Sequence, residues 1–340
     1  MKRPYLLNLI LLFSALVLSV AVGAVYIPPA AIIRIITAAS TFQPDPELVS
    51  ETMTTIVLQL RLPHSILIVI AGAALAASGA GYQGLFQNPL ADPYLIGVAS
   101  GAGLGAVLAM SISWPANLLG YFSIPVAAFV GAAITVIIVY RLARFGNALS
   151  ITNLILAGVA VGSFASALTS FIMLQSVGEV RRAISWLLGG STISGWAPVI
   201  ASLPYIAISL GILVTAGYAL NVLQFGDEQA QQLGLPVERI KLLIILAASL
   251  ATATAVSFTG VIGFIGLIVP HMVRILWGPD YRKLIPLSIL AGATTLLIAD
   301  LLARTLLAPQ EIPVGVITAL AGAPFFLWIL RRFQRGEMKF

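Results

Sequence analysis

The sequence contains no cysteine and few charged residues, and each shortage excludes a class of protein. Without cysteine there is no disulfide framework, thiol nucleophile or thiolate metal site. Charged residues make up only 9% of the 340 residues, whereas apolar residues make up 59%. A soluble domain carries roughly a quarter charged residues. The composition therefore indicates a chain whose main solvent is the lipid bilayer.

Motifs for hydrolysis, metal catalysis and proton relay are also missing. No GxxxxGK[ST] phosphate loop occurs, so this chain is not expected to hydrolyse ATP alone. There is no HExxH motif, and the two histidines, His64 and His271, are expected near opposite membrane faces, which excludes a shared metal. We interpret His271 as a structural cap. The spans lack mid-membrane acids and bases, which disfavours an ion-coupled carrier, although sodium sites built from backbone carbonyls would leave no charge to see.

Apolar stretches follow one another along the whole chain, which predicts a single transmembrane domain over residues 1–340 and an all-α integral membrane fold. A spanning helix needs about 20 mainly apolar residues. The N-terminal apolar run is longer than that of a signal peptide, so we expect it to be a span. The predicted spans are residues 6–26, 64–84, 94–111, 118–140, 150–173, 196–217, 239–258, 261–276, 284–303 and 313–331.

Basic residues lie between these spans and predict the orientation. Of the 18 lysines and arginines, thirteen fall on the side of the termini and five fall opposite. Because cytoplasmic loops are enriched in lysine and arginine, both termini are expected to be cytoplasmic. The net charge of +6 does not cluster on one face or tail, so no nucleic-acid partner is expected.

Small residues dominate most spans, as in Ala71–Gly81, and they predict a dense bundle because close backbone approach drives helix association in lipid. Two Gly- and Pro-broken stretches, Gly84–Gly97 and Thr259–Arg274, follow long helices at matching places in the two halves. Such breaks are typical of transporters built from repeats. Chance similarity of glycine-rich helices is the alternative.

A polar loop between the sixth and seventh spans, about residues 226–238, predicts a short helix. Asp227 and Glu228 would stand in its first turn, which suits the helix dipole, and Gly234 and Pro236 would end it. The helix is either a solvated connector or a docking element for a soluble partner.

Several motifs in this order resemble the FecCD/BtuC family of ABC importer permeases over nearly the whole chain. They are LRLPH (residues 60–64), AGAALAASGAGYQGLFQNPLADPYLIGVASGAG (71–103), LILAGVAVG (154–162), the 226–238 loop, GVIGFIGLIVPHMVR (260–274) and ADLLARTLLAPQEIPVGVITALAGAPFF (299–326). The resemblance implies the type II ABC importer permease fold with ten spans in a bacterial or archaeal cytoplasmic membrane. Two copies would form a pathway for a ferric siderophore or, alternatively, haem or cobalamin, with oxyanions ranked last.

The resemblance also implies partners and sites. ABC ATPase subunits would use ATP and Mg²⁺, an extracytoplasmic binding protein would deliver cargo, and this chain would bind no cofactor. The implied ATPase-coupling residues are Gln229, Ala230, Gln231, Gln232, Leu233, Gly234 and Leu235. The implied cytoplasmic gate residues are Asn88, Leu90, Ile151 and Thr152, of which Asn88 and Thr152 could instead be helix caps.

On the outer face, Arg61, His64 and Arg304 match positions that hold acidic groups of the binding protein in this family. The family often has arginine in place of His64, so docking would be weaker or pH-sensitive here. Snorkelling is the alternative for the two arginines. Arg181 and Arg182 could contact an anionic cargo or sit in solvent beside Glu179.

Overall fold

The computed structural model describes residues 3–23, 25–41, 51–115, 117–145, 148–175, 178–190 and 194–334, and these are helical except for one short strand pair and the connections. The α-helices are α1 (Arg3–Ala21), α2 (Pro29–Thr41), α3 (Glu51–Thr55), α4 (Leu62–Leu85), α5 (Val98–Met110), α6 (Leu118–Ala143), α7 (Ile151–Gln175), α8 (Val180–Leu187), α9 (Trp196–Thr215), α10 (Gly217–Leu223), α11 (Asp227–Gln232), α12 (Val237–Thr259), α13 (Ile265–Trp277), α14 (Tyr281–Thr305) and α15 (Val314–Gln334). A π-helical turn, η1 (Ile56–Arg61), a 3-10 turn, η2 (Pro93–Ile96), and the antiparallel strands β1 (Arg144–Phe145) and β2 (Ala148–Leu149) complete the described elements.

Each of the ten predicted spans coincides with an apolar helix. Among the residues that the structure describes, seven helices are long and apolar enough to cross a membrane, and the shorter apolar helices lie at Val98–Met110, Ile265–Trp277 and Val314–Ile329. The prediction of an all-helical, multi-pass membrane fold is therefore confirmed. The first span is shifted, because α1 ends at Ala21 rather than near residue 26.

Helices at the span ends were not predicted. The helix α2 is separate, and α3 and η1 continue into α4, so one helical path runs over Glu51–Leu85. The predicted span begins at residue 64, whereas α4 begins at Leu62 and has Pro63 in its first turn, where the missing N–H of proline is tolerated. The π-helical turn η1 precedes that turn. The helices α8 and α10 were likewise missed.

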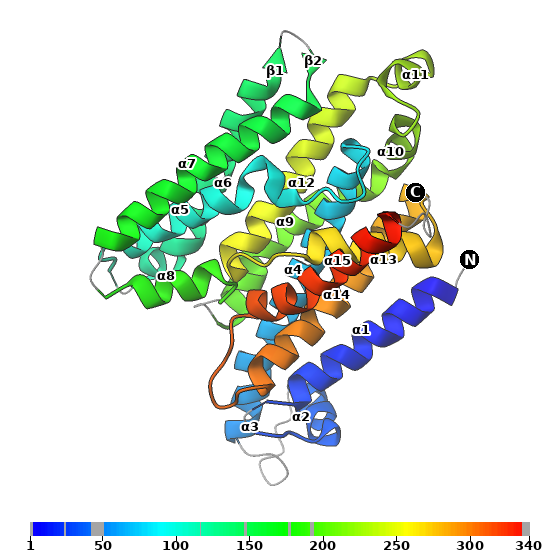
Figure 1. Ribbon diagram of the computed structural model, residues 1–340. Coiled ribbons are helices and arrows are strands. Elements are labelled where there is room, and N and C mark those ends of the chain that lie inside the picture. Colours follow the sequence, from blue (N-terminus) through cyan, green and yellow to red (C-terminus); the bar gives the residue numbers. More distant parts are fainter. Residues whose placement is uncertain are drawn as a thin grey trace.

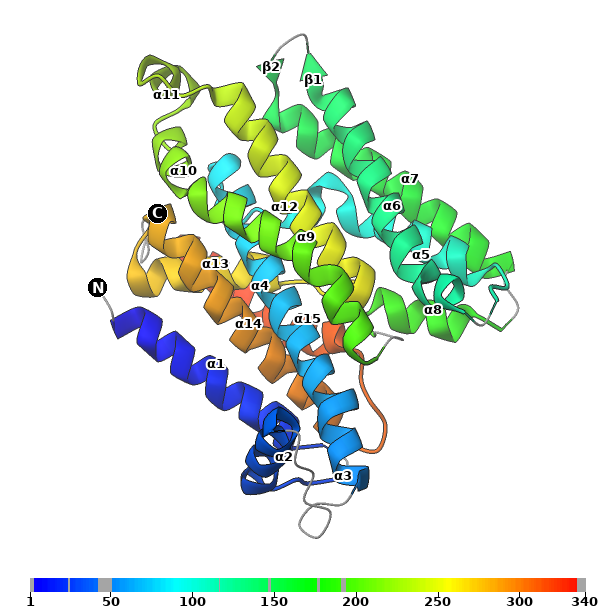
Figure 2. The same ribbon diagram turned by 180° about the vertical axis from the view of Figure 1, so that it is seen from behind.

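Helix α4 packs in the interior of the bundle against α14, α12, α13 and α9 (Figures 1 and 2). Its glycines permit close backbone approach: a Cβ atom on Gly79 would lie 1.8 Å from the Gly266 carbonyl oxygen, and one on Gly72 would lie 2.4 Å from that of Gly292. No side chain fits at such distances. The predicted dense packing through small residues is confirmed.

The two broken stretches meet inside the bundle. The Tyr94 hydroxyl donates to the Ile262 carbonyl oxygen at 2.8 Å and accepts from the Ile262 N–H at 3.2 Å. The Gln83 amide donates to the carbonyl oxygens of Gly266 and Leu267 at 3.3 and 3.1 Å. The bonds to Ile262 satisfy backbone groups that a regular helix would have paired, as irregular backbone at membrane depth requires.

The helices that precede the two broken stretches, α4 and α12, run antiparallel. The Ser78 and Thr252 hydroxyls are 2.6 Å apart, and one turn further along α4 the Tyr82 hydroxyl is 2.7 Å from that of Ser249, one turn back along α12. The helices before the two breaks therefore run in opposite directions, as inverted repeats in transporters require.

The bundle has two distinct ends. One carries β1, β2, α10 and α11, and α1 begins and α15 ends on this side (Figure 1). The other carries α2, α3 and α8 (Figures 1 and 2). We call them the α11 end and the α2 end. Because α1 begins and α15 ends at the α11 end, both chain termini approach this end, as the even number of spans predicts.

Candidate functional site

Helix α11 stands clear of the bundle at the α11 end. Gly226 and Gly234 flank it with φ angles of +97° and +83°, and the chain closes its end with bonds from Gly234 N–H to Gln231 O (2.9 Å) and from Leu235 N–H to Ala230 O (3.0 Å). This is the glycine-terminated helix end that the sequence predicted. Of the predicted coupling residues, Ala230 is buried, Leu235 is half-buried, and Gln229, Gln231, Gln232, Leu233 and Gly234 are exposed.

A buried lysine that sequence reasoning assigned only to topology connects α11 to the bundle. The Lys241 side chain is 2% exposed; its ammonium donates to the Asp227 carboxylate on α11 and lies 3.9 Å from Glu238 Oε1. Glu238 Oε2 in turn accepts from the Leu149 N–H of β2 at 3.1 Å. We call Asp227, Lys241, Glu238 and Leu149 the Lys241 relay. The i,i+3 spacing of Glu238 and Lys241 was the available sequence signal.

The relay ends close to the predicted gate. Strand β2 stops at Leu149 and α7 begins at Ile151, so Leu149 is two residues from that gate residue. Thr152 is exposed and does not cap α7. Ser150 takes that role, because its hydroxyl accepts a hydrogen bond from the Asn153 N–H at 3.3 Å. The capping alternative for Thr152 is therefore wrong.

The other two gate residues lie in the connection after α4. The exposed Asn88 side chain accepts from the Leu90 N–H at 3.0 Å, which closes a local turn, and Leu90 is half-buried. The helix-capping alternative for Asn88 is therefore wrong, because Phe86 ends α4 and Asp92 caps η2, while Asn88 only closes the turn between them. The neighbouring Gln87 amide donates to the Leu223 carbonyl of α10, which holds this connection at the α11 end.

At the α2 end, the structure brings the predicted docking residues together around a carboxylate. Asp300 is 4% exposed; it accepts from Arg304 Nε at 2.9 Å and lies 2.9 Å from His64 Nε2. Arg304 also donates to the Ser19 hydroxyl at 2.8 Å. Arg304 is only 13% exposed and His64 29%. Asp300 was not among the docking residues predicted from the sequence.

Arg61 of the same group holds the turn after α1. Its guanidinium donates to the carbonyl oxygens of Val20 (2.9 Å), Ala21 (3.3 Å) and Val25 (2.6 Å). Val20 and Ala21 end the helix and Val25 follows it, so Arg61 supplies donors where helical ones run out, although the Ala21 carbonyl also accepts from the Ile27 N–H at 3.0 Å. Two guanidiniums against one carboxylate leave this cluster with a net positive charge before any protonation of His64.

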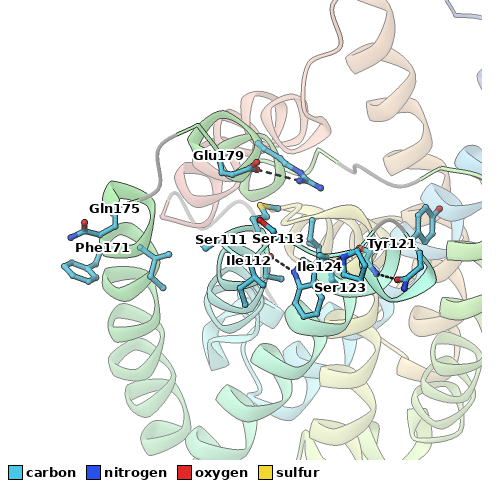
Figure 3. A pocket seen from close by; sticks show the side chains of 17 residues that line it. Ser111, Ile112, Ser113, Tyr121, Ser123, Ile124, Phe171, Gln175 and Glu179 are labelled. Carbon is cyan, nitrogen blue, oxygen red and sulfur yellow. Dashed lines mark hydrogen bonds and ion pairs between the residues drawn. The ribbon is translucent and has the colours of Figure 1, made fainter.

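The structure separates Arg181 from Arg182. Both are exposed on α8, but only Arg182 lines a cavity of 1190 Å³ at the α2 end, and its guanidinium lies 3.7 Å from Glu179 Oε2. The cavity lies between the ends of α5 and α7 and the starts of α6 and α8 (Figure 3). Its labelled lining residues are Ser111, Ile112, Ser113, Tyr121, Ser123, Ile124, Phe171, Gln175 and Glu179.

A second polar group links α10 to α14 at the α11 end. The Asn221 amide donates to Asp280 at 2.7 Å and its carbonyl accepts from the Tyr281 N–H at 2.9 Å. The hydrogen bond from the Asn221 side-chain amide is the main cause of the lowered pKa of Asp280. The hydrogen bond from the Arg282 N–H and the positive charges of Arg282 and Lys283 lower this pKa further. Asp280 thus caps α14 as an anion.

No described group of histidines and carboxylates can hold a metal ion. His271, interpreted as a cap, is instead 1% exposed inside α13, so that interpretation is wrong.

Within the described residues, seven long apolar helices and three shorter ones surround two broken segments that meet between antiparallel helices, which is typical of a multi-pass transport protein. A model of the FecCD transport family matches residues 10–332. The cobalamin import system permease protein BtuC of Halobacterium salinarum is 46% identical over 283 residues, covering 83% of this chain and 75% of that protein. The hemin transport system permease protein HmuU of Yersinia pestis is 41% identical over 291 residues, covering 85% and 86%.

A solved structure described as the inward-facing conformation of a metal-chelate type ABC transporter superposes with a TM-score of 0.81 at 28% identity, covering 97% of this chain and 99% of that chain. The chain therefore belongs to the FecCD transport family. It is the permease subunit of an ABC importer and is not itself catalytic.

Proposed function

We propose that two copies of this chain form the pathway that imports a ferric siderophore or another iron chelate across a bacterial or archaeal cytoplasmic membrane. The family and the metal-chelate type transporter that shares the fold support this cargo. Haem and cobalamin are the alternatives, because the relatives HmuU and BtuC are named for them. The α11 end, with both termini, faces the cytoplasm in this proposal, in agreement with the thirteen-to-five distribution of basic residues.

In the proposed assembly, ATPase subunits dock on α11 and use ATP and Mg²⁺, while this chain binds neither. The exposure of Leu233, at 70%, supports this role because a large apolar side chain in water favours a partner surface. The buried ammonium of Lys241 then passes any displacement of α11 to β2 and the start of α7. Asn88, Leu90, Ile151 and Thr152 form the cytoplasmic gate at the end of that path.

A binding protein docks on the α2 end. The net positive charge of Arg61, Arg304 and Asp300 supports contact with an acidic surface, and long-range attraction would set the encounter rate and register more than the affinity. His64 adds a second positive charge when protonated. Arg182 is the better candidate for cargo contact, since it lines the cavity; we retain Arg181 as an exposed neighbour at the pathway mouth.

Reconstitution tests this function directly. The chain is purified with its co-purifying ATPase, placed in proteoliposomes and supplied with ATP and binding protein loaded with ferric siderophore, haem or cobalamin in turn. We expect uptake of one cargo class that requires ATP and stops when Leu233→Glu is introduced, while Arg331→Glu, an exposed change on α15, leaves uptake unchanged. Uptake driven by an ion gradient without nucleotide would replace the importer with a secondary carrier.

A further inference from the structure

A groove with two chemically different halves opens between α6 and α12 near the α11 end. It encloses 360 Å³, and the two helices lie side by side (Figure 2). Its lining consists of Val136, Ile137, Tyr140, Arg141, Arg144, Leu242, Ile245 and Leu246. Five aliphatic side chains, one tyrosine and two arginines therefore share one surface, and no carboxylate belongs to this lining.

The sequence spacing orders these side chains along the membrane normal. On α6, Ile137 and Arg141 are four residues apart and share one face. Arg144 follows in β1 and lines the same groove, so both basic groups lie nearer the α11 end than Ile137 does. On α12, Leu242 and Leu246 likewise lie deeper than the helix start. The groove is thus apolar toward the middle of the bundle and basic at its end.

The groove faces away from the protein interior. Ile137 is 52% exposed and Leu246 is 56% exposed, and both arginines are exposed. Exposed aliphatic side chains on spanning helices contact lipid tails, and arginines one to two turns further along reach the headgroup layer. Exposed Arg239, three residues before Leu242 on the same face of α12, adds a third positive charge.

The carboxylate nearest to this face on α12 is already engaged. Glu238 accepts from the Leu149 N–H and lies 3.9 Å from the Lys241 ammonium. It therefore offers the groove little opposing charge. A ligand that fits must combine long apolar chains with a negative headgroup.

We propose that this groove is a binding site for one anionic phospholipid, such as phosphatidylglycerol or cardiolipin, with its phosphate at Arg141 and Arg144 and an acyl chain along Ile137, Leu242 and Leu246. Basic pockets between helices on the cytoplasmic side suit such headgroups. The site does not depend on the proposed cargo or on the proposed coupling role of α11.

The position gives this lipid access to the Lys241 relay. Arg144 is the β1 partner of Leu149 in the strand register, and the Leu149 N–H is held by Glu238. A phosphate on Arg144 therefore restrains the strand pair that leads into α7. Anionic lipid stabilises one position of that strand pair, and neutral lipid does not.

Binding is measured by native mass spectrometry on the purified full-length chain titrated with phosphatidylglycerol or phosphatidylcholine. Each basic residue near a lipid headgroup contributes about 1 kcal/mol, so Arg141→Gln with Arg144→Gln should weaken phosphatidylglycerol binding about 30-fold, which is about 2 kcal/mol. Arg3→Gln with Arg331→Gln is the matched control. Both arginines are exposed and lie toward the α11 end, and the two substitutions remove the same charge as the Arg141 and Arg144 pair. We expect the control to bind as the natural chain does.

Equal loss in both double variants, or equal binding of phosphatidylcholine, would overturn the proposal. Loss of ATPase association without any change in lipid binding would assign the arginines to the ATPase interface instead.

Photo-crosslinking supplies a measurement that does not depend on the variants folding normally. Phosphatidylglycerol with a photoactivatable acyl chain should label peptides that contain residues 136–144 and 242–246, and unlabelled phosphatidylglycerol should compete. Glycerol phosphate should not compete, because it lacks the chain that the apolar half holds. Competition by glycerol phosphate, or labelling spread evenly over exposed helices, would contradict a lipid site.

Discussion

Replacing the buried lysine beneath α11 by methionine separates folding from coupling. Lys241→Met keeps an unbranched side chain of similar length in the 2%-exposed position but removes the ammonium that holds Asp227 and Glu238. A hydrogen bond to a charged group contributes about 1.5–3 kcal/mol. Removing one partner of a fully buried pair costs about 3–5 kcal/mol, because the other charge is stranded.

Here the two carboxylates are 45% and 41% exposed, so water replaces the ammonium at both. The desolvation cost of the lysine also disappears. We therefore expect Lys241→Met to lower the free energy of unfolding by only about 1–2 kcal/mol, within the range of an ordinary point mutation. The protein should still fold and insert.

Coupling should suffer far more, because α11 loses its charged link to α12 and β2. In proteoliposomes with the ATPase and loaded binding protein, we expect cargo moved per ATP hydrolysed to fall about fivefold or more, which corresponds to roughly 1 kcal/mol of lost coupling free energy. Lys283→Met is the control, since Lys283 is 46% exposed at the same end. An unchanged ratio for Lys241→Met, or an equal loss for Lys283→Met, would refute the relay.

Three further predictions concern stability. Gly79→Ala would place a methyl group 1.8 Å from a carbonyl oxygen of α13, so the free energy of unfolding should fall by about 1–3 kcal/mol or more and the melting temperature should fall with it. Gly263→Ala is the control and should change the melting temperature little, because a Cβ atom there has no neighbour within 4 Å. Tyr94→Phe should cost about 1–3 kcal/mol in chemical unfolding, because it leaves a buried carbonyl without its donor. The pKa of Asp280 is lowered, mainly by its hydrogen bond with Asn221, so the ionised carboxylate stabilises the fold fully above the unfolded-state pKa of about 3.9, and this stabilisation is lost as pH falls through the folded-state pKa. Asp280→Asn should therefore reduce the fall of the melting temperature with decreasing pH in the acid range. An unchanged pH dependence would contradict the assignment.

The sequence predicted the spans well because each helix in lipid must satisfy its own backbone and be long enough to cross. The same rule says nothing about amphipathic pieces at the boundary, so α2, α8 and α10 were missed. It also missed the helical path that precedes α4, which runs from Glu51 through η1 before the predicted start at residue 64. Local chemistry predicted α11 because Gly234 and Pro236 end a helix whatever surrounds it.

The sites were less predictable, because their partners are distant in the chain. Asp300 joins His64 across 236 residues, and no pattern in a single sequence encodes that distance. Lys241 was visible only as one basic residue among many until its burial was known. The gate and docking assignments came from family resemblance, and they remain predictions that the contacts around Asn88 and Arg304 now make specific.

The pair of bonds between Tyr94 and Ile262 has a mechanical consequence. They join the two irregular connections that follow α4 and α12. Neither connection can swing alone as a flap, so the centre of each subunit behaves as a rigid block. In the proposed pair, alternating access then requires one whole subunit to tilt against the other. A small molecule would therefore inhibit transport by binding at the interface between the two subunits rather than in the interior of either.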